Sequence, residues 1–106
     1  MNKENTKKNP GIKLKSSVKR QRVNFSFVGD TVKEVSIVGD FNSWNPEVHP
    51  MKRDKYGIWE KDLIIPPGIY EYKFLVDGNW TEDPKNNQKN TNCFGTYNSV
   101  LNHFQK

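Results

Sequence analysis

Two tryptophans and a lysine are the residues of this chain best suited to hold a ligand by noncovalent contacts. From Tyr70 to Val76, every second residue is aromatic or aliphatic, and the residues between them include Glu71 and Lys73. The chain then continues with Asp77-Gly78 and Asn79-Trp80. Asp-Gly is a preferred loop of a two-residue hairpin, because both loop residues need a positive φ. The turn therefore brings Trp80 beside the strand that carries Lys73, and we expect both side chains to face outward. An indole beside an ammonium group indicates a binding surface.

The second tryptophan, Trp44, lies in the turn-forming stretch Gly-Asp-Phe-Asn-Ser-Trp-Asn-Pro at residues 39–46. A loop rich in turn formers rarely carries two large aromatic residues without a use for them. We expect Phe41 to anchor this loop in the core and Trp44 to be an exposed platform. The alternative is that Trp44 caps the core.

Catalytic chemistry finds little support in the sequence. Asp77, Glu82 and Asp83 are close together, but Asp77 is needed in the turn and the other two are predicted to face solvent, whereas a glycosidase needs two carboxylates flanking the scissile bond. Neither histidine, His49 or His103, has a plausible nucleophilic neighbour. The sequence also lacks a glycine-rich phosphate loop and metal-ligand spacing. We therefore predict a binding module that is not an enzyme and has no cofactor and no metal.

The basic charge of the chain is concentrated at its N-terminus. Residues 1–22 carry eight Lys and Arg against one acidic residue, a charge of +7, whereas residues 23–106 carry nine against eleven, a charge of −2. A nucleic-acid-binding face would need Lys and Arg on the folded surface, so only the tail could supply such binding. Because residues 1–20 have few apolar positions, we predict a disordered tail there and one domain at residues 21–106.

The single cysteine, Cys93, excludes an internal disulfide and gives no support for an oxidising compartment. No stretch resembles a signal peptide or a membrane span, and the Met-Asn start excludes myristoylation. We therefore expect a cytoplasmic protein without a membrane partner.

Short alternating segments separated by turn formers predict an all-β fold. Strands are expected at about 22–28, at 35–39, near Met51, from Ile58 to Ile65, in the central hairpin, and at about 96–103, with Trp59 in the core and a polar surface loop at 85–92. Without helical periodicity, this pattern favours an immunoglobulin-like antiparallel β-sandwich.

Four motifs, taken in order, resemble a known family. They are the turn at residues 39–44, the run from Pro67 to Trp80, the pair Asp83-Pro84 and the segment Gly95-Thr96-Tyr97-Asn98. They are similar to the glycogen-binding module of the AMP-activated protein kinase beta subunit, a type of early-set domain also found near the N-terminus of isoamylases and glycogen-branching enzymes. The resemblance covers about residues 22–104.

The resemblance implies a non-catalytic module that binds α-1,4-linked glucans such as glycogen, starch or maltooligosaccharides on one exposed face. By similarity, Trp44 and Trp80 are sugar platforms, Lys73 and Asn98 hydrogen-bond to sugar hydroxyls, and Thr96 assists them. The physical chemistry agrees, because a pyranose ring has an apolar C–H face for an aromatic plane and a rim of hydroxyls for polar groups.

The sequence departs from the kinase module at Phe94, where that module carries a leucine that reaches into the curve of the glucan. Phe94 is retained as a site residue, either stacking on a sugar or filling space that a glucan needs. The chain ends at Lys106, without the kinase-binding extension of that subunit, so we expect no kinase partnership; a glucan-metabolising enzyme or a regulatory protein stays open as a partner. The alternative function is a protein-interaction β-sandwich that has lost sugar binding.

Overall fold

The computed structural model of the protein describes residues 19–104. Nearly all of the predicted tail at residues 1–20 therefore lies outside the described residues, and only Lys19 and Arg20 of it are seen, both exposed. Within residues 19–104, no helix is long and apolar enough to cross a membrane.

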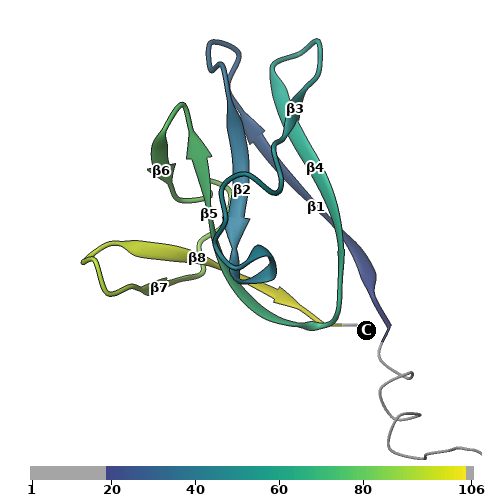
Figure 1. Ribbon diagram of the computed structural model, residues 1–106, viewed down its shortest axis with the longest axis vertical. Coiled ribbons are helices and arrows are strands. Elements are labelled where there is room, and N and C mark those ends of the chain that lie inside the picture. Colours follow the sequence, from purple (N-terminus) through teal and green to yellow (C-terminus); the bar gives the residue numbers. More distant parts are fainter. Residues whose placement is uncertain (1–18, 105–106) are drawn as a thin grey trace, which may run out of the picture.

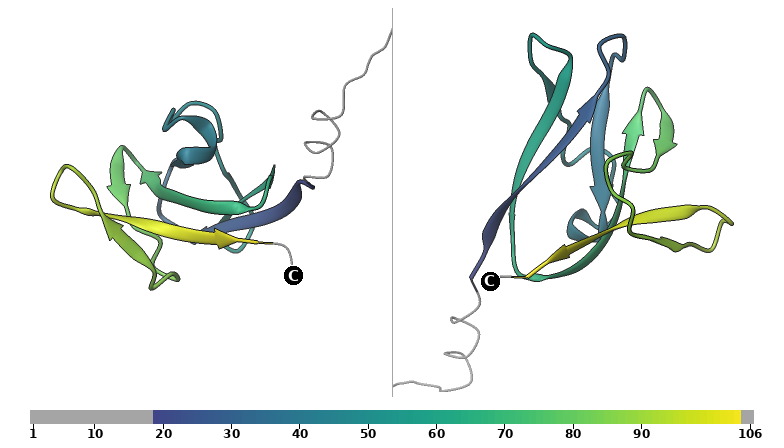
Figure 2. Two further views of the ribbon diagram at one scale, coloured as in Figure 1. Left: turned by 90° about the horizontal axis from the view of Figure 1, so that it is seen from below. Right: turned by 180° about the vertical axis from the view of Figure 1, so that it is seen from behind.

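Two antiparallel sheets pack face to face, as Figures 1 and 2 show. The smaller sheet has the order β1-β4-β3 and is formed by β1 (Gln21–Val28), β4 (Ile58–Ile65) and β3 (Lys52–Arg53). The larger sheet has the order β2-β5-β8-β7, with β6 paired to β5; its strands are β2 (Val35–Gly39), β5 (Gly68–Val76), β6 (Asn79–Thr81), β7 (Lys89–Thr91) and β8 (Tyr97–His103). This architecture confirms the predicted immunoglobulin-like β-sandwich.

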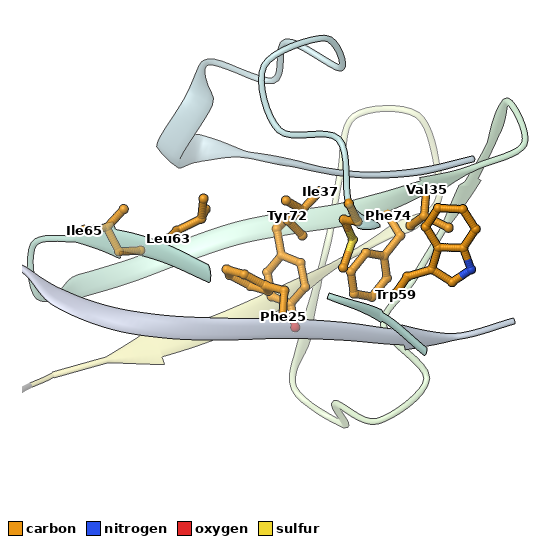
Figure 3. Close-up of a cluster of buried hydrophobic side chains, with 9 residues drawn as sticks. Phe25, Val35, Ile37, Trp59, Leu63, Ile65, Tyr72 and Phe74 are labelled. Carbon is orange, nitrogen blue, oxygen red and sulfur yellow. The ribbon is translucent and has the colours of Figure 1, made fainter. Parts of the chain in front are cut away.

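The core lies between the two sheets and is built from the side chains that their strands direct inward (Figure 3). On β1 and β4, the register pairs Phe27 with Trp59, and Trp59 is 8% exposed. Phe41 packs against this core with its ring centroid 5.4 Å from that of Phe25. The predicted core positions of Trp59 and Phe41 are therefore confirmed. Burial of such aromatic side chains is the main source of stability in a small sandwich.

The hairpin between β5 and β6 forms as predicted. Asp77 and Gly78 have φ values of 47° and 83°, the left-handed conformations that a type I′ loop requires. Asp77 has a second role, because its Oδ1 accepts hydrogen bonds from the backbone N–H groups of Lys33 (3.0 Å) and Glu34 (2.8 Å). The carboxylate thus fastens the loop between β1 and β2 to the tip of the hairpin.

Two predictions about the segment after β6 are wrong. The polar stretch at 85–92 is not wholly loop, since β7 pairs with β8 there; all three of its residues are exposed, so it shows no polar and apolar alternation. Asp83 does not face solvent freely, because its Oδ2 accepts a 2.7 Å hydrogen bond from the Tyr72 hydroxyl. Burial raises the pKa of Tyr72 above its usual value. The hydrogen bond from Asn86 lowers this pKa, whereas the Asp83 carboxylate raises it further.

Candidate carbohydrate-binding site

One open cavity of about 800 Å³ lies on the outer face of the larger sheet. All six residues that the sequence predicted for the site line it: Trp44, Lys73, Trp80, Phe94, Thr96 and Asn98. They come from four places in the chain, namely the turn after β2, the middle of β5, β6 and the β7–β8 hairpin. Figure 1 shows that β6 and the β7–β8 hairpin both project from the same side of the sandwich.

Trp44 is presented by a turn held in an unusual backbone conformation. The 3₁₀ turn η1 (Asp40–Asn42) is followed by Ser43 and Trp44, whose φ values of 56° and 58° are left-handed. Left-handed residues other than glycine cost roughly 1 kcal/mol or more each, so other interactions must hold this turn. Asn42 supplies two of them, as its Oδ1 accepts from the Gly39 N–H (3.0 Å) and its Nδ2 donates to the Ile37 carbonyl (3.0 Å).

The two indoles lie beside each other and at an angle. Their ring centroids are 6.4 Å apart and their planes are inclined by 59°. Trp80 is 51% exposed, as expected of a platform, whereas Trp44 is only half-buried rather than fully exposed. Trp44 donates a 2.9 Å hydrogen bond from its Nε1 to Oδ1 of Asp40. It is therefore neither a core cap nor a free surface side chain.

Lys73 departs most from its predicted surroundings. Period-two alternation places it correctly on the outer face of β5, but its side chain is only 8% exposed instead of projecting into solvent. Its Nζ donates a 3.0 Å hydrogen bond to Oγ1 of Thr96. Because an ammonium group has three N–H donors, two remain for other acceptors after this bond. Lys73 thus places a charged donor at the base of the cavity.

Asn98 is 9% exposed and has a defined amide orientation. Its Nδ2 donates to Oε1 of Glu71 (3.0 Å), and its Oδ1 accepts from Nδ2 of Asn92 (3.0 Å). The same Nδ2 of Asn92 also donates to Oγ1 of Thr96 (2.8 Å). A carboxylate can only accept here, so the contact with Glu71 identifies which end of the Asn98 side chain is the amino group. One N–H of that group and part of the acceptor capacity of Oδ1 remain for a ligand.

Phe94 and Cys93 lie on the loop between β7 and β8 at the rim of the cavity. Phe94 is 84% exposed, and its backbone N–H donates a 3.0 Å hydrogen bond to Oδ1 of Asn92. The Asn92 side chain therefore shapes the loop that holds this aromatic ring over the cavity. Cys93 is a free, exposed thiol.

Sequence reasoning missed four residues that also line the cavity: Asp40, Glu71, Asn92 and Cys93. The alternation of β5 placed Glu71 on the outer face with Lys73, so its position was predictable although its hydrogen bonds were not. Asp40 gave no signal beyond its place in a turn, and Asn92 was one of several asparagines in a polar stretch. No cluster of three or more potential metal-ligating side chains occurs within residues 19–104.

Comparison with known proteins identifies the family. The sequence model described as the glycogen recognition site of AMP-activated protein kinase matches residues 21–105. A pig 5'-AMP-activated protein kinase subunit beta-1 is 36% identical over 87 residues, which cover 82% of this chain and 67% of that protein. A 1,4-alpha-glucan branching enzyme GlgB from Prochlorococcus marinus (strain NATL1A) is 38% identical over 69 residues, which cover 62% of this chain but only 9% of the enzyme.

Among solved structures, a maltogenic amylase from S. marinus has the same fold, with a TM-score of 0.67 and 23% identity. The similarity covers 82% of this chain and 14% of the amylase chain. The chain thus spans about a tenth of the branching enzyme and about two thirds of the pig kinase subunit sequence, but only about a quarter of the human, mouse and rat beta-2 subunits. Since the family match extends over nearly all of the sandwich, this chain belongs to the family of glycogen recognition domains of AMP-activated protein kinase.

Proposed function

We propose that this domain binds an α-1,4-linked glucan without chemically changing it, at the cavity lined by the six residues predicted from the sequence. The observation that carries the proposal is the pair of indoles, 6.4 Å apart and inclined by 59°, above buried polar groups. An α-1,4-linked chain curves, so two neighbouring glucose rings present their C–H faces at an angle. Two inclined aromatic planes match that curvature better than a flat surface does.

Each side chain has a distinct part in the proposed complex. Trp44 and Trp80 each cover one sugar face, while Phe94 contacts the glucan from the opposite rim. The free N–H donors of Lys73 and Asn98 take sugar hydroxyl oxygens as acceptors, and Thr96 holds the Lys73 ammonium toward the cavity. Since most of these contacts are to neutral groups, binding is modest, with a dissociation constant on the order of 10 μM to 1 mM.

The names of the relatives support the proposed ligand class. The family model that this chain matches is described as the glycogen recognition site of AMP-activated protein kinase, and the branching enzyme is named for a 1,4-alpha-glucan. A glucan-metabolising enzyme or a regulatory protein fits such a domain as a further partner. The cytoplasm remains the proposed compartment, on the sequence argument from the single cysteine.

Tryptophan fluorescence titration with maltoheptaose tests the proposal directly. We expect saturable binding, no binding of a β-1,4-linked cello-oligosaccharide, and little change between low and high salt. Trp80→Ala should weaken binding about tenfold, since stacking on an aromatic plane contributes about 1–3 kcal/mol in the related case of nucleic-acid bases. Tyr56→Ala is the matched control, because Tyr56 is an exposed aromatic side chain outside the cavity.

Two results would contradict the proposal. The absence of any titration at millimolar maltoheptaose would refute glucan binding, and the protein-interaction function would replace it. Unchanged affinity in both Trp80→Ala and Asn98→Ala would show that the glucan binds outside this cavity. Binding of nucleic acid that falls steeply with salt would instead point to the basic N-terminal residues.

A further inference from the structure

The turn that carries Trp44 is linked to the centre of the larger sheet by one carboxylate. Oδ1 of Asp40 accepts the indole Nε1–H of Trp44 at 2.9 Å, and Oδ2 accepts the backbone N–H of Glu71 at 2.7 Å. Glu71 is on β5, two residues before Lys73. Asp40 therefore connects the indole directly to the strand that forms the base of the cavity. Hydrogen bonds to an ionised acceptor are shorter and stronger than those between neutral groups.

This link matters because the backbone alone fixes the Trp44 ring poorly. Ser43 and Trp44 both have left-handed backbone conformations, and the backbone N–H of Trp44 donates to the Gly39 carbonyl at 2.9 Å. These features define the path of the chain but not the rotation of the indole ring. An indole held at its N–H as well as at its Cα has little freedom about either side-chain torsion. The bond to Asp40 supplies that second point.

Trp80 is positioned relative to the same strand, β5, by backbone pairing instead of a side-chain hydrogen bond. It lies directly opposite Leu75 in the β5–β6 ladder, so its position follows from the register of the hairpin. Both indoles are thus positioned relative to β5, Trp80 through backbone pairing and Trp44 through Asp40. The register fixes the backbone of Trp80 and the face on which its ring lies, whereas the Asp40 bond restricts the rotation of the Trp44 ring, and both contribute to the 59° angle between the rings.

We infer that Asp40 is a positioning residue that sets the angle between the two indoles. It acts through Trp44 and not through a contact of its own with the sugar. The functional consequence rests on the proposed glucan binding, but the structural part, the fixed angle, does not. This separation allows the two to be tested independently.

Circular dichroism tests the angle without any ligand. Two indoles at this separation couple electronically and give paired bands of opposite sign, whose size depends on the angle between the rings. We expect the parent to show such a pair and Trp44→Phe and Trp80→Phe each to abolish it. Asp40→Ala should reduce the pair strongly. Asp40→Asn should reduce it partly, because the side-chain oxygen of asparagine accepts hydrogen bonds but its NH2 group only donates them, so one of the two bonds is lost.

Asp54→Ala is the matched control. Oδ1 of Asp54 accepts the N–H groups of Tyr56 (2.8 Å) and Ile58 (3.0 Å), so this carboxylate also holds a turn, but one outside the cavity. The control should keep the paired bands even if its unfolding midpoint falls. Paired bands unchanged in Asp40→Ala would overturn the inference. The same is true if Asp54→Ala reduces them equally, because the effect would then be general loosening.

A double-mutant cycle on maltoheptaose affinity tests whether Asp40 acts through Trp44. Asp40→Ala should weaken binding about three- to tenfold in the parent, consistent with partial loss of one platform, and should have no further effect in a Trp44→Ala background. An equal loss in both backgrounds would mean that Asp40 contacts the sugar itself, which contradicts the inference. If the parent binds no glucan while Asp40→Ala still reduces the paired bands, the proposed function fails and the positioning role stands.

Discussion

Replacing the buried lysine of the cavity should separate binding from stability. Lys73 is 8% exposed, and its ammonium group donates to Oγ1 of Thr96 at 3.0 Å. Taking an ammonium group out of water costs several kcal/mol, which one hydrogen bond to a neutral hydroxyl offsets only in part. Lys73→Met keeps most of the apolar stem and removes the charge. We therefore expect the free energy of unfolding to stay unchanged or rise by roughly 1 kcal/mol.

The same change should weaken glucan binding. A hydrogen bond from a charged donor contributes about 1.5–3 kcal/mol, which corresponds to about a 10- to 150-fold change in the dissociation constant. Thr96 loses one donor but keeps the hydrogen bond from Nδ2 of Asn92 at 2.8 Å, so the β7–β8 hairpin should retain its shape. The measurements are a fluorescence titration with maltoheptaose and a urea unfolding curve on each variant.

Lys61→Met is the control for Lys73→Met, since Lys61 is a partly buried lysine on β4 in the opposite sheet. It should leave affinity unchanged. Two outcomes would refute the reasoning. If Lys73→Met binds maltoheptaose within about twofold of the parent, a difference of only about 0.4 kcal/mol, the ammonium does not contact the sugar. If the variant is less stable by several kcal/mol, the charge supports the fold rather than burdening it.

Three further variants test the fold. Trp59→Ala should lower the free energy of unfolding by roughly 3–5 kcal/mol, because it empties a buried site and removes the 2.9 Å hydrogen bond from Nε1 to the Gly29 carbonyl; a urea midpoint like that of the parent would contradict the core assignment. Deleting residues 1–20 should leave the unfolding midpoint and glucan affinity intact, and a drop of several degrees would show that Ile12, Leu14 or Val18 packs on the sandwich. Burial, and to a lesser extent the nearby Lys61 charge, lowers the pKa of His49 in the folded protein below 6.5. As the pH falls, His49 is therefore protonated in the unfolded chain before it is protonated in the folded protein, and the free energy of unfolding should decrease below about pH 6.5. Urea midpoints between pH 5 and 8 should show a weaker dependence in His49→Gln, and an identical dependence would exclude His49 as a source.

The elements that alternate in type were predictable from the sequence. Period-two patterns placed Phe25 and Phe27 inward on β1 and separated Tyr72 from Lys73 on β5, because a pleated strand converts sequence spacing directly into a face. The Asp77-Gly78 turn was predictable for a different reason, since few residue pairs accept two positive φ values. By contrast, β7 has no apolar side to reveal it, and only its pairing with β8 makes it a strand.

The predicted surroundings of the site residues were less accurate than their positions. Alternation gives the face on which Lys73 lies but not what covers that face. Here the loop between β7 and β8, which is distant in the sequence, brings Thr96 into a hydrogen bond with the Lys73 ammonium group. Trp44 was likewise placed correctly in a turn, yet the hydrogen bond that joins this turn to β5, from the Glu71 N–H to Asp40, spans 31 residues. Such contacts depend on tertiary structure, and no local spacing announces them.

The cavity concentrates features that a sequence selected for stability alone would avoid. A buried ammonium group and a 51% exposed indole line it, and so does Trp44, the second of two consecutive left-handed residues without a glycine. The opposite sheet instead contributes buried aromatic and aliphatic side chains to the core. Strain and buried polarity of this kind persist where the surroundings hold them and where they serve a function. The polar network of Asp40, Glu71, Asn92 and Asn98 supplies that support. Variants of this network should therefore reduce affinity more than stability, and variants of the core should do the reverse.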